Sequence, residues 1–152
     1  MASRVQLEDF DVGAEIAALS AGGGEIGAIV TFTGTVRGTT KNGPIQEMHL
    51  EHYPSMTEGE LARVEAEANA RWPLAASLIV HRYGILKPGD NIVLVIAASA
   101  HRQAAFDAAQ FMMDYLKTQA PFWKKEVGAD GTGRWVSANE RDDKALKRWS
   151  AE

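Results

Sequence analysis

Three lysines beside aromatic and apolar residues are the first candidates for chemistry in this sequence. Between Asp114 and Glu126 the chain reads DYLKTQAPFWKKE, which contains Lys117, Lys124 and Lys125. Lysine ammonium groups are strongly hydrated and normally stay on solvated faces. A bound anion that completes their environment would explain why they stand here. The alternative is that the lysine stems lie along the aromatic rings while the charged heads reach water.

A second basic cluster precedes a long helical pattern. Ser99-Ala100-His101-Arg102 leads into apolar periodicity that predicts a helix to about Thr118. Ser99 is a good N-cap, so we expect His101 and Arg102 in the first turn. An arginine there faces the positive end of the helix dipole, at a cost of roughly 0.3–1 kcal/mol. An anion would remove this conflict and engage free backbone N–H groups. Alternatively, Arg102 turns to solvent or pairs with a carboxylate.

The length of this helix constrains any site that uses both clusters. His101 and Lys117 are 16 residues apart, a separation of ~24 Å at about 1.5 Å per residue. One small molecule cannot contact both ends of such a helix. Either there are two unrelated sites, or His101 and Arg102 of one chain meet Lys117 of a second. We expect the second arrangement, which makes the protein a homodimer.

A further arginine ends a predicted strand. From Ile26 to Arg37 apolar residues alternate with hydroxyl-bearing ones, which is typical of a strand with two different faces. Residues 38–44 are polar and glycine-containing, and we expect a flexible loop there. Arg37 therefore stands at a strand end beside a loop, a common position for ligand contacts. A lone arginine in this position is also a normal surface residue.

Other patterns predict the elements that must position these residues. A capping aspartate, Asp11, a capping-box sequence beginning at Thr57 and a charged tail from Glu140 to Trp149 indicate three further helices. The uniformly apolar run Ile92 to Ala98 is typical of a central strand covered on both faces. Further strands are expected around Val5 to Leu7, Met48 to Tyr53 and Leu78 to Tyr83, with a turn at Pro88-Gly89 and a hairpin formed by Phe122 to Val127 and Arg134 to Val136.

Composition limits the classes of function. The 152 residues are expected to form a single domain, 1–152, and the formal net charge of −4 argues against broad nucleic-acid binding. No apolar run is long enough to span a membrane and no signal peptide opens the chain, so we expect a cytoplasmic protein. The absence of cysteine excludes thiolate metal sites and a cysteine nucleophile. His49 and His52 would point to opposite faces of a strand, so we expect no metal site.

Five ordered motifs give the sequence a strong resemblance to one family, the large, catalytic subunit of molybdopterin synthase. They are TFTGTVR (31–37), LEHYPSMTE (50–58), RWPL (71–74), SAHR (99–102) and MDYLKTQAPFWKKE (113–126). The resemblance runs from roughly Val5 to Trp149. It implies an α+β protein with an α/β hammerhead-type fold and an additional antiparallel β subdomain.

The resemblance also implies an activity and partners. Large subunits of this family form a homodimer with a small ubiquitin-like subunit at each end, a heterotetramer. The small subunit carries a C-terminal Gly-Gly thiocarboxylate, from which two sulfurs are transferred to cyclic pyranopterin monophosphate to make molybdopterin. No cofactor is implied. Competing interpretations are a non-catalytic module that binds the Gly-Gly tail of a ubiquitin-like partner, and a small phosphate- or nucleotide-sensing module.

Residue by residue, the resemblance implies a site that draws on several elements. Lys117 and Lys124 are expected to be catalytic, with Lys117 nearest the transferring sulfur. The expected substrate-binding residues are Thr35, Val36, Arg37, His101, Arg102, Lys117, Lys124, Lys125 and Glu126, and the expected pocket-lining residues are Phe32 and Met113. Some relatives carry an arginine near Asn139, where this chain has Arg141 as the closest, so either position is a candidate for a further contact.

Overall fold

A four-stranded sheet forms the centre of the fold in the computed structural model, which describes residues 1–136 and 140–149, with side chains for 1–136 and 144–149. Its strand order is β1-β5-β7-β2. The strands are β1 (Ala2–Gln6), β5 (Leu74–Arg82), β7 (Asn91–Ser99) and β2 (Ala28–Thr35). β1 pairs with β5 in parallel and the other pairs are antiparallel. β7 is central and almost wholly buried, which confirms the prediction from its apolar run.

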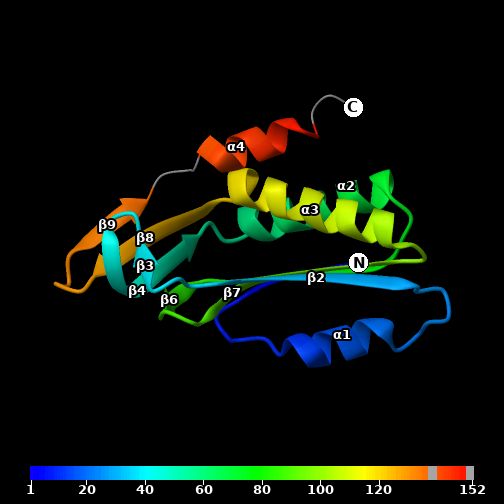
Figure 1. Ribbon diagram of the computed structural model, residues 1–152, viewed down its shortest axis with the longest axis horizontal. Coiled ribbons are helices and arrows are strands. Elements are labelled where there is room, and N and C mark those ends of the chain that lie inside the picture. The colour runs from blue at the N-terminus through cyan, green and yellow to red at the C-terminus, as the bar shows by residue number, and fades with distance from the viewer. Residues whose placement is uncertain (137–139, 150–152) are drawn as a thin grey trace.

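Helices cover both faces of this sheet (Figure 1). α1 (Val12–Ser20) lies on one face, where its apolar side packs on a cluster that contains Leu78, Val80, Leu94 and Ile96. α2 (Met56–Arg71) and α3 (Arg102–Gln119) lie on the other. α2 packs against β1 and β5, whereas α3 packs against β7 and β2. The long basic-ended helix therefore lies along the β2 side of the sheet.

A second, antiparallel sheet extends from one end of the first. Its order is β3-β4-β8-β9, and β6 also pairs with β4. The strands are β3 (Thr39–Thr40), β4 (Gly43–His52), β6 (Gly84–Leu86), β8 (Phe122–Gly128) and β9 (Gly133–Val136). A cluster of Val36, Ile45, Met48, Leu50 and Leu86 forms its apolar core. The combination of a helix-covered sheet and an antiparallel extension confirms the expected α+β class.

Local signals explain most element boundaries. The Asp11 carboxylate accepts a hydrogen bond from the Ala14 N–H at 3.0 Å, so the predicted N-cap of α1 is confirmed. Gly89 has φ of +92° and the Asp90 N–H donates to the Lys87 carbonyl, which confirms the predicted turn at Pro88-Gly89. The hairpin of β8 and β9 is also confirmed. No described helix has the length and apolarity needed to cross a membrane.

Three boundary predictions were wrong. Ser99 is the last residue of β7 and its hydroxyl donates to the Pro73 carbonyl at 2.8 Å, so His101 is the N-cap of α3 instead. α2 begins one residue before Thr57, because Ser55 is its N-cap and the Glu58 carboxylate accepts from the Ser55 N–H at 2.6 Å. The expected loop at 38–44 contains β3 and the start of β4, which pair as a short hairpin.

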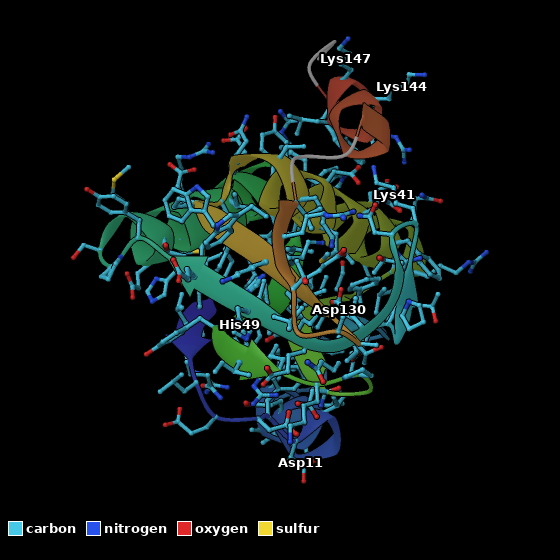
Figure 2. All side chains as sticks on the ribbon, turned by 90° about the vertical axis from the view of Figure 1, so that its left-hand side faces the viewer. Asp11, Lys41, His49, Asp130, Lys144 and Lys147 are labelled. Carbon is cyan, nitrogen blue, oxygen red and sulfur yellow. The ribbon has the colours of Figure 1, made fainter. Side chains whose placement is uncertain are left out.

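The C-terminal helix α4 (Glu140–Lys147) docks on α3. The contact is anchored by Trp149, which lies just after the end of α4. The indole ring packs edge-on against Trp72 and Phe111, and its N–H donates to an Asp114 carboxylate oxygen at 2.7 Å. Asp11 at the start of α1 and Lys147 at the end of α4 lie on opposite sides of the molecule (Figure 2). Trp149 therefore anchors the C-terminal segment on α3.

Candidate functional site

The two basic clusters occupy opposite ends of α3. This helix is continuous over 18 residues, a length of ~27 Å at about 1.5 Å per residue. Arg102 is its first residue and Lys117 lies in its last turn. The separation predicted from sequence is therefore confirmed, and no compact ligand can contact both clusters within one chain.

A pocket of about 340 Å³ opens at the first of these ends, where α3 begins. It is lined by Gly27, Ala28, Ala100, His101, Arg102 and Gln103. The side chains of His101 and Arg102 are exposed, so they are available to a ligand. Because the first N–H groups of a helix have no intrahelical partner and carry positive partial charge, this pocket suits an anion. Basic side chains and backbone N–H groups would act together there.

Gly27 sets the shape of this pocket. A methyl group at position 27 would lie 2.2 Å from the Ala100 carbonyl oxygen, a contact that only a glycine avoids. The Gly27 N–H donates to the Ser99 carbonyl at 2.9 Å, which holds the start of β2 against the end of β7. The glycine therefore fixes the backbone that leads into His101 and Arg102.

At the other end of α3, Lys117 lies within electrostatic range of a cluster of rings. The His81 imidazole stacks on Phe122, with ring centroids 3.7 Å apart, and the His52 ring contacts both Tyr83 and Phe122. The charges of Lys117 and His52 both act on His81. His81, His52 and Phe122 come from β5, β4 and β8, and Tyr83 directly follows β5, so the cluster joins the two sheets at the point where α3 ends.

His81 is a neutral imidazole in this environment. Burial lowers the pKa of His81 to about 4; the hydrogen bond to the Arg82 carbonyl opposes this, and the positive charges of Lys117 and His52 add to it. His81 Nδ1 lies 2.8 Å from that carbonyl oxygen, which can only accept, so Nδ1 carries the proton. The ring therefore adds no positive charge of its own beside Lys117.

Lys124 and Glu126 share one face of β8. Lys124 is opposite Leu50 of β4 and Val136 of β9, and Glu126 is opposite Met48. Glu126 is buried, with a side chain that accepts a hydrogen bond from the Thr40 hydroxyl at 3.2 Å. It also lines a pocket of about 320 Å³ between the β3–β4 and β8–β9 hairpins. Glu126 therefore connects the predicted site to the hairpin formed by β3 and β4.

Lys125 points to the opposite face of the same sheet. Its stem lies against Gly133, where a methyl group would be 2.2 Å from Lys125 Cε, and its ammonium is 5.8 Å from the centre of the Trp135 ring. This is a cation–π arrangement on an exposed surface. The structure thus separates Lys125 from Lys124 and Glu126, as the alternation along a strand requires.

The remaining predicted residues are spread along β2 and α3. Thr35 is exposed at the end of β2, which stops two residues before Arg37 although the predicted strand included it; Arg37 is also exposed. Val36 is buried in the core of the second sheet and can offer a ligand only its backbone. Phe32 is 42% exposed, whereas Met113 is only 8% exposed. Asn139 lies outside the described residues, and the Arg141 side chain is likewise not described.

Sequence reasoning missed the ring cluster beside Lys117. His81, His52 and Phe122 lie far apart along the chain and no local pattern links them; only the pairing of β4 with β8 and the crossing of β5 bring them together. Within the described residues no group of three or more histidine and carboxylate side chains gathers in a way that could hold a metal ion.

Comparison with known proteins identifies the family to which the chain is similar. The family model described as "MoaE protein" matches residues 5–119. The molybdopterin synthase catalytic subunit of Mesorhizobium japonicum is 56% identical over 97% of this chain and 92% of its own length. The molybdopterin biosynthesis MoaE protein of Burkholderia ambifaria has 52% identity and a TM-score of 0.84, covering 100% of both chains. Molybdopterin synthase of Staphylococcus aureus has 32% identity and a TM-score of 0.80, covering 88% of this chain and 95% of its own.

These matches confirm the family expected from the five motifs. The matched region includes both basic ends of α3, and Arg37 just after β2. The chain belongs to the MoaE family, the catalytic subunits of molybdopterin synthase.

Proposed function

We propose that this chain is a sulfurtransferase that converts cyclic pyranopterin monophosphate to molybdopterin. The two sulfurs come from the C-terminal thiocarboxylate of a small ubiquitin-like subunit. The observation that carries the proposal is the division of cationic groups between the two ends of α3, with Lys117 beside the ring cluster and His101 and Arg102 at the pocket. Both the cyclic phosphate and the thiocarboxylate are anions, so each end of the helix suits one of them.

The pocket at the start of α3 is the proposed phosphate site. The Arg102 guanidinium offers several N–H donors in a fixed fork that matches phosphate oxygens, and the helix N-terminus adds backbone donors. His101 supplies a further donor. Arg37, at the exposed end of β2, would contact the phosphate or the pterin.

The end of α3 near Lys117 is the proposed site of sulfur transfer. The thiocarboxylate sulfur forms a bond to a pterin carbon as an oxygen substituent leaves that carbon. Water then cleaves the acyl–sulfur bond, which leaves a carboxylate on the partner tail and a thiolate on the substrate. The Lys117 ammonium would polarise the acyl carbonyl and exchange protons during this cleavage. Lys124 and Glu126 would anchor the tail of the partner.

Neutral His81 favours this assignment for Lys117. An imidazolium beside the lysine would compete for the anionic tail and repel the ammonium. Because burial keeps the ring uncharged above a pH of about 4, Lys117 is the cation that an incoming thiocarboxylate meets at this point. The stacking of His81 on Phe122 also fixes the strand that leads to Lys124.

A reconstituted assay tests the proposed reaction. Purified protein, a thiocarboxylated small subunit and the pterin substrate should yield molybdopterin. Lys117→Ala should abolish the product without changing the unfolding midpoint, and Lys144→Ala, which removes an exposed lysine of α4, should leave it unchanged. Normal turnover by Lys117→Ala would remove this residue from the chemistry. If His101→Ala/Arg102→Ala binds the small subunit and still forms product normally, the phosphate site lies elsewhere.

Mixing two inactive variants tests whether the site is shared between chains. A dimer of one Arg102→Ala chain and one Lys117→Ala chain has one site with both residues intact. After exchange of equal amounts, about a quarter of wild-type activity should return, because about half of the dimers are mixed and each has one working site of two. A site built within one chain would show no recovery.

A further inference from the structure

One histidine of the ring cluster, His52, lies on the same sheet face as Lys124. His52 is the last residue of β4 and is opposite Phe122, the first residue of β8. Lys124 is two residues further along β8, opposite Leu50. Residues directly opposite each other in an antiparallel pair share a face, and every second residue along a strand returns to it. His52 and Lys124 are therefore diagonal neighbours, about 7–8 Å apart.

Contacts from three other parts of the chain hold the His52 ring in place. Its centroid is 4.4 Å from that of Tyr83 and 6.1 Å from that of Phe122. Its Nδ1 lies 3.2 Å from the hydroxyl oxygen of Thr57, a wholly buried residue in the first turn of α2. The imidazole is thus fixed by two rings and one polar contact.

Thr57 also determines which nitrogen of His52 carries the proton. The Thr57 hydroxyl donates to the Tyr53 carbonyl at 2.8 Å and accepts from the Tyr53 N–H at 3.1 Å. A hydroxyl has a single proton, so towards His52 it can only accept, and Nδ1 is the donor. In the neutral ring the lone pair is therefore on Nε2, which is the atom that can accept a proton.

Nε2 of His52 is open to solvent. No described residue forms a hydrogen bond with it. Yet among the described residues the one buried side-chain nitrogen or oxygen without a hydrogen-bond partner is Nε2 of His49, on the other face of β4. Nε2 of His52 must therefore reach an accessible surface. An imidazole anchored through Nδ1 and open at Nε2 has the arrangement that a general base requires.

The second imidazole of the cluster is poorly suited to that role. His81 stacks on Phe122 with ring centroids 3.7 Å apart, and the charges of His52 and Lys117 both act on it. The end of β4, the start of β8 and the end of α3 thus meet at one place (Figure 1). Burial lowers the pKa of His81 to about 4, which makes it a weak base at neutral pH. His52 is the better proton acceptor of the two.

The other ionisable groups on this side of the sheet do not supply the same function. A lysine ammonium has three donors and no acceptor, so Lys117 and Lys124 can polarise a carbonyl but cannot take a proton from water. Glu126 is an acceptor, but its carboxylate already accepts from the Thr40 hydroxyl. By the strand register it also lies beyond Lys124, on the side away from the end of α3.

We propose that His52 is the general base for cleavage of the acyl–sulfur bond. The inference rests on the proposed function, because it assigns a residue to the second half of that reaction. Water gives one proton to Nε2 of His52 as its oxygen bonds to the acyl carbon of the partner tail. The carbon–sulfur bond then breaks, and the sulfur stays on the pterin carbon as a thiolate. The tail is left as a carboxylate, whose proton passes to solvent, and His52 releases its own proton to solvent before the next transfer.

Replacing His52 by asparagine separates the proposed base from its structural contact. The amide can donate to the Thr57 hydroxyl as Nδ1 does, but it places no basic nitrogen where Nε2 stands. With a thiocarboxylated small subunit and the pterin substrate, His52→Asn should form the first carbon–sulfur bond at the wild-type rate. Cleavage of the acyl–sulfur bond should be about 10²–10⁴-fold slower. A covalent adduct of small subunit and pterin should therefore accumulate, and mass spectrometry of the intact small subunit detects it.

His49→Asn is the matched control, because it makes the same change on the same strand but on the opposite face (Figure 2). It should turn over like the wild type and accumulate no adduct. Product release by His52→Asn at the wild-type rate, without adduct, would overturn the proposal. A folded His52→Asn variant that binds the small subunit but forms neither adduct nor product would overturn it as well, because His52 would then act before the cleavage.

Added imidazole gives a second test that does not depend on stability. His52→Ala removes the whole ring, so imidazole in solution can enter the vacated space and serve as the base. The rate of adduct cleavage by His52→Ala should rise with imidazole concentration, whereas that of Lys117→Ala should not. Because the comparison is made within one variant, a change in its folding does not affect the result. No response of His52→Ala to imidazole would show that the missing group is not a base.

The two proposals fail in different ways. A wild-type protein that makes no molybdopterin in the reconstituted assay would exclude the proposed function, and the role of His52 with it. Wild-type turnover together with unimpaired turnover by His52→Asn would exclude only the role of His52 and leave the proposed function intact.

Discussion

Replacing His81 by asparagine tests whether burial keeps this imidazole neutral beside Lys117. The folded protein has a His81 pKa of about 4, compared with an ordinary value of 6.5. Between these values the unfolded chain binds a proton that the folded chain does not, so the free energy of unfolding falls as the pH falls. The difference between the two pKa values corresponds to a loss of about 3 kcal/mol at most when the pH drops from above 6.5 to below 4.

Asparagine suits the test because its side-chain amide can donate to the Arg82 carbonyl as Nδ1 of the histidine does. It loses the stacking on Phe122, which should lower stability by about 0.5–1.5 kcal/mol at every pH. The amide does not titrate, however. His81→Asn should therefore be less stable than the wild type at pH 7.5, and the difference should shrink or reverse toward pH 4.5.

Urea unfolding at a series of pH values measures this difference. Comparison with the wild type at each pH removes the contribution of all other titrating groups, including the buried carboxyl of Glu65. His101→Asn is the matched control, because it makes the same change at a histidine whose side chain is exposed. If the wild type and His81→Asn lose stability in parallel from pH 7.5 to 4.5, burial does not lower the pKa of His81. The idea that His81 is a neutral imidazole beside Lys117 would then be excluded.

Three further changes test other parts of the fold. Trp149→Phe should lower the free energy of unfolding measured in urea by about 1–3 kcal/mol, because the Asp114 carboxylate loses its indole donor while most of the packing remains. A decrease as large as that of Trp149→Ala would mean that the packing is not retained. Burial raises the pKa of Glu65, so its ionisation destabilises the folded state as the pH rises through that pKa. The free energy of unfolding of Glu65→Gln, measured in urea, should therefore fall less steeply above pH 4.5 than that of the wild type. The same pH dependence in both proteins would contradict this. Gly27→Ala should weaken inorganic phosphate binding and lower the melting temperature, because its methyl group would meet the Ala100 carbonyl, whereas Gly24→Ala, which meets nothing, should do neither.

Local patterns were sufficient to predict most of the fold. The Asp11 cap, the buried strand β7 and the β8–β9 hairpin depend on residues that are neighbours in sequence, so their signals are readable without tertiary information. The wrong cap for α3 has a tertiary cause. Ser99 is a suitable capping residue, but its hydroxyl is engaged by the Pro73 carbonyl, which reaches it through the pairing of β5 with β7.

The candidate site was only partly predictable for the same reason. The lysines and arginines could be found by type and by motif, and the separation of His101 from Lys117 followed from helix length. The orientation of Lys125 away from Lys124 follows from strand alternation. The role of His81 could not be predicted, because it depends on three strands meeting at the end of α3.

With the proposed site shared between chains, the fixed length of α3 would make the activity of this chain depend on its association. Both ends of the helix are held, by the close approach of Gly27 to Ala100 at the start and by Pro121 after the end. A fully extended arginine or lysine side chain reaches about 6 Å, so two of them cannot close the ~22 Å that separates Arg102 from Lys117 along the helix. Specific activity should therefore fall when the protein is diluted below the dissociation constant of the proposed dimer. A specific activity that is independent of dilution while light scattering detects monomers would mean that one chain carries the whole site.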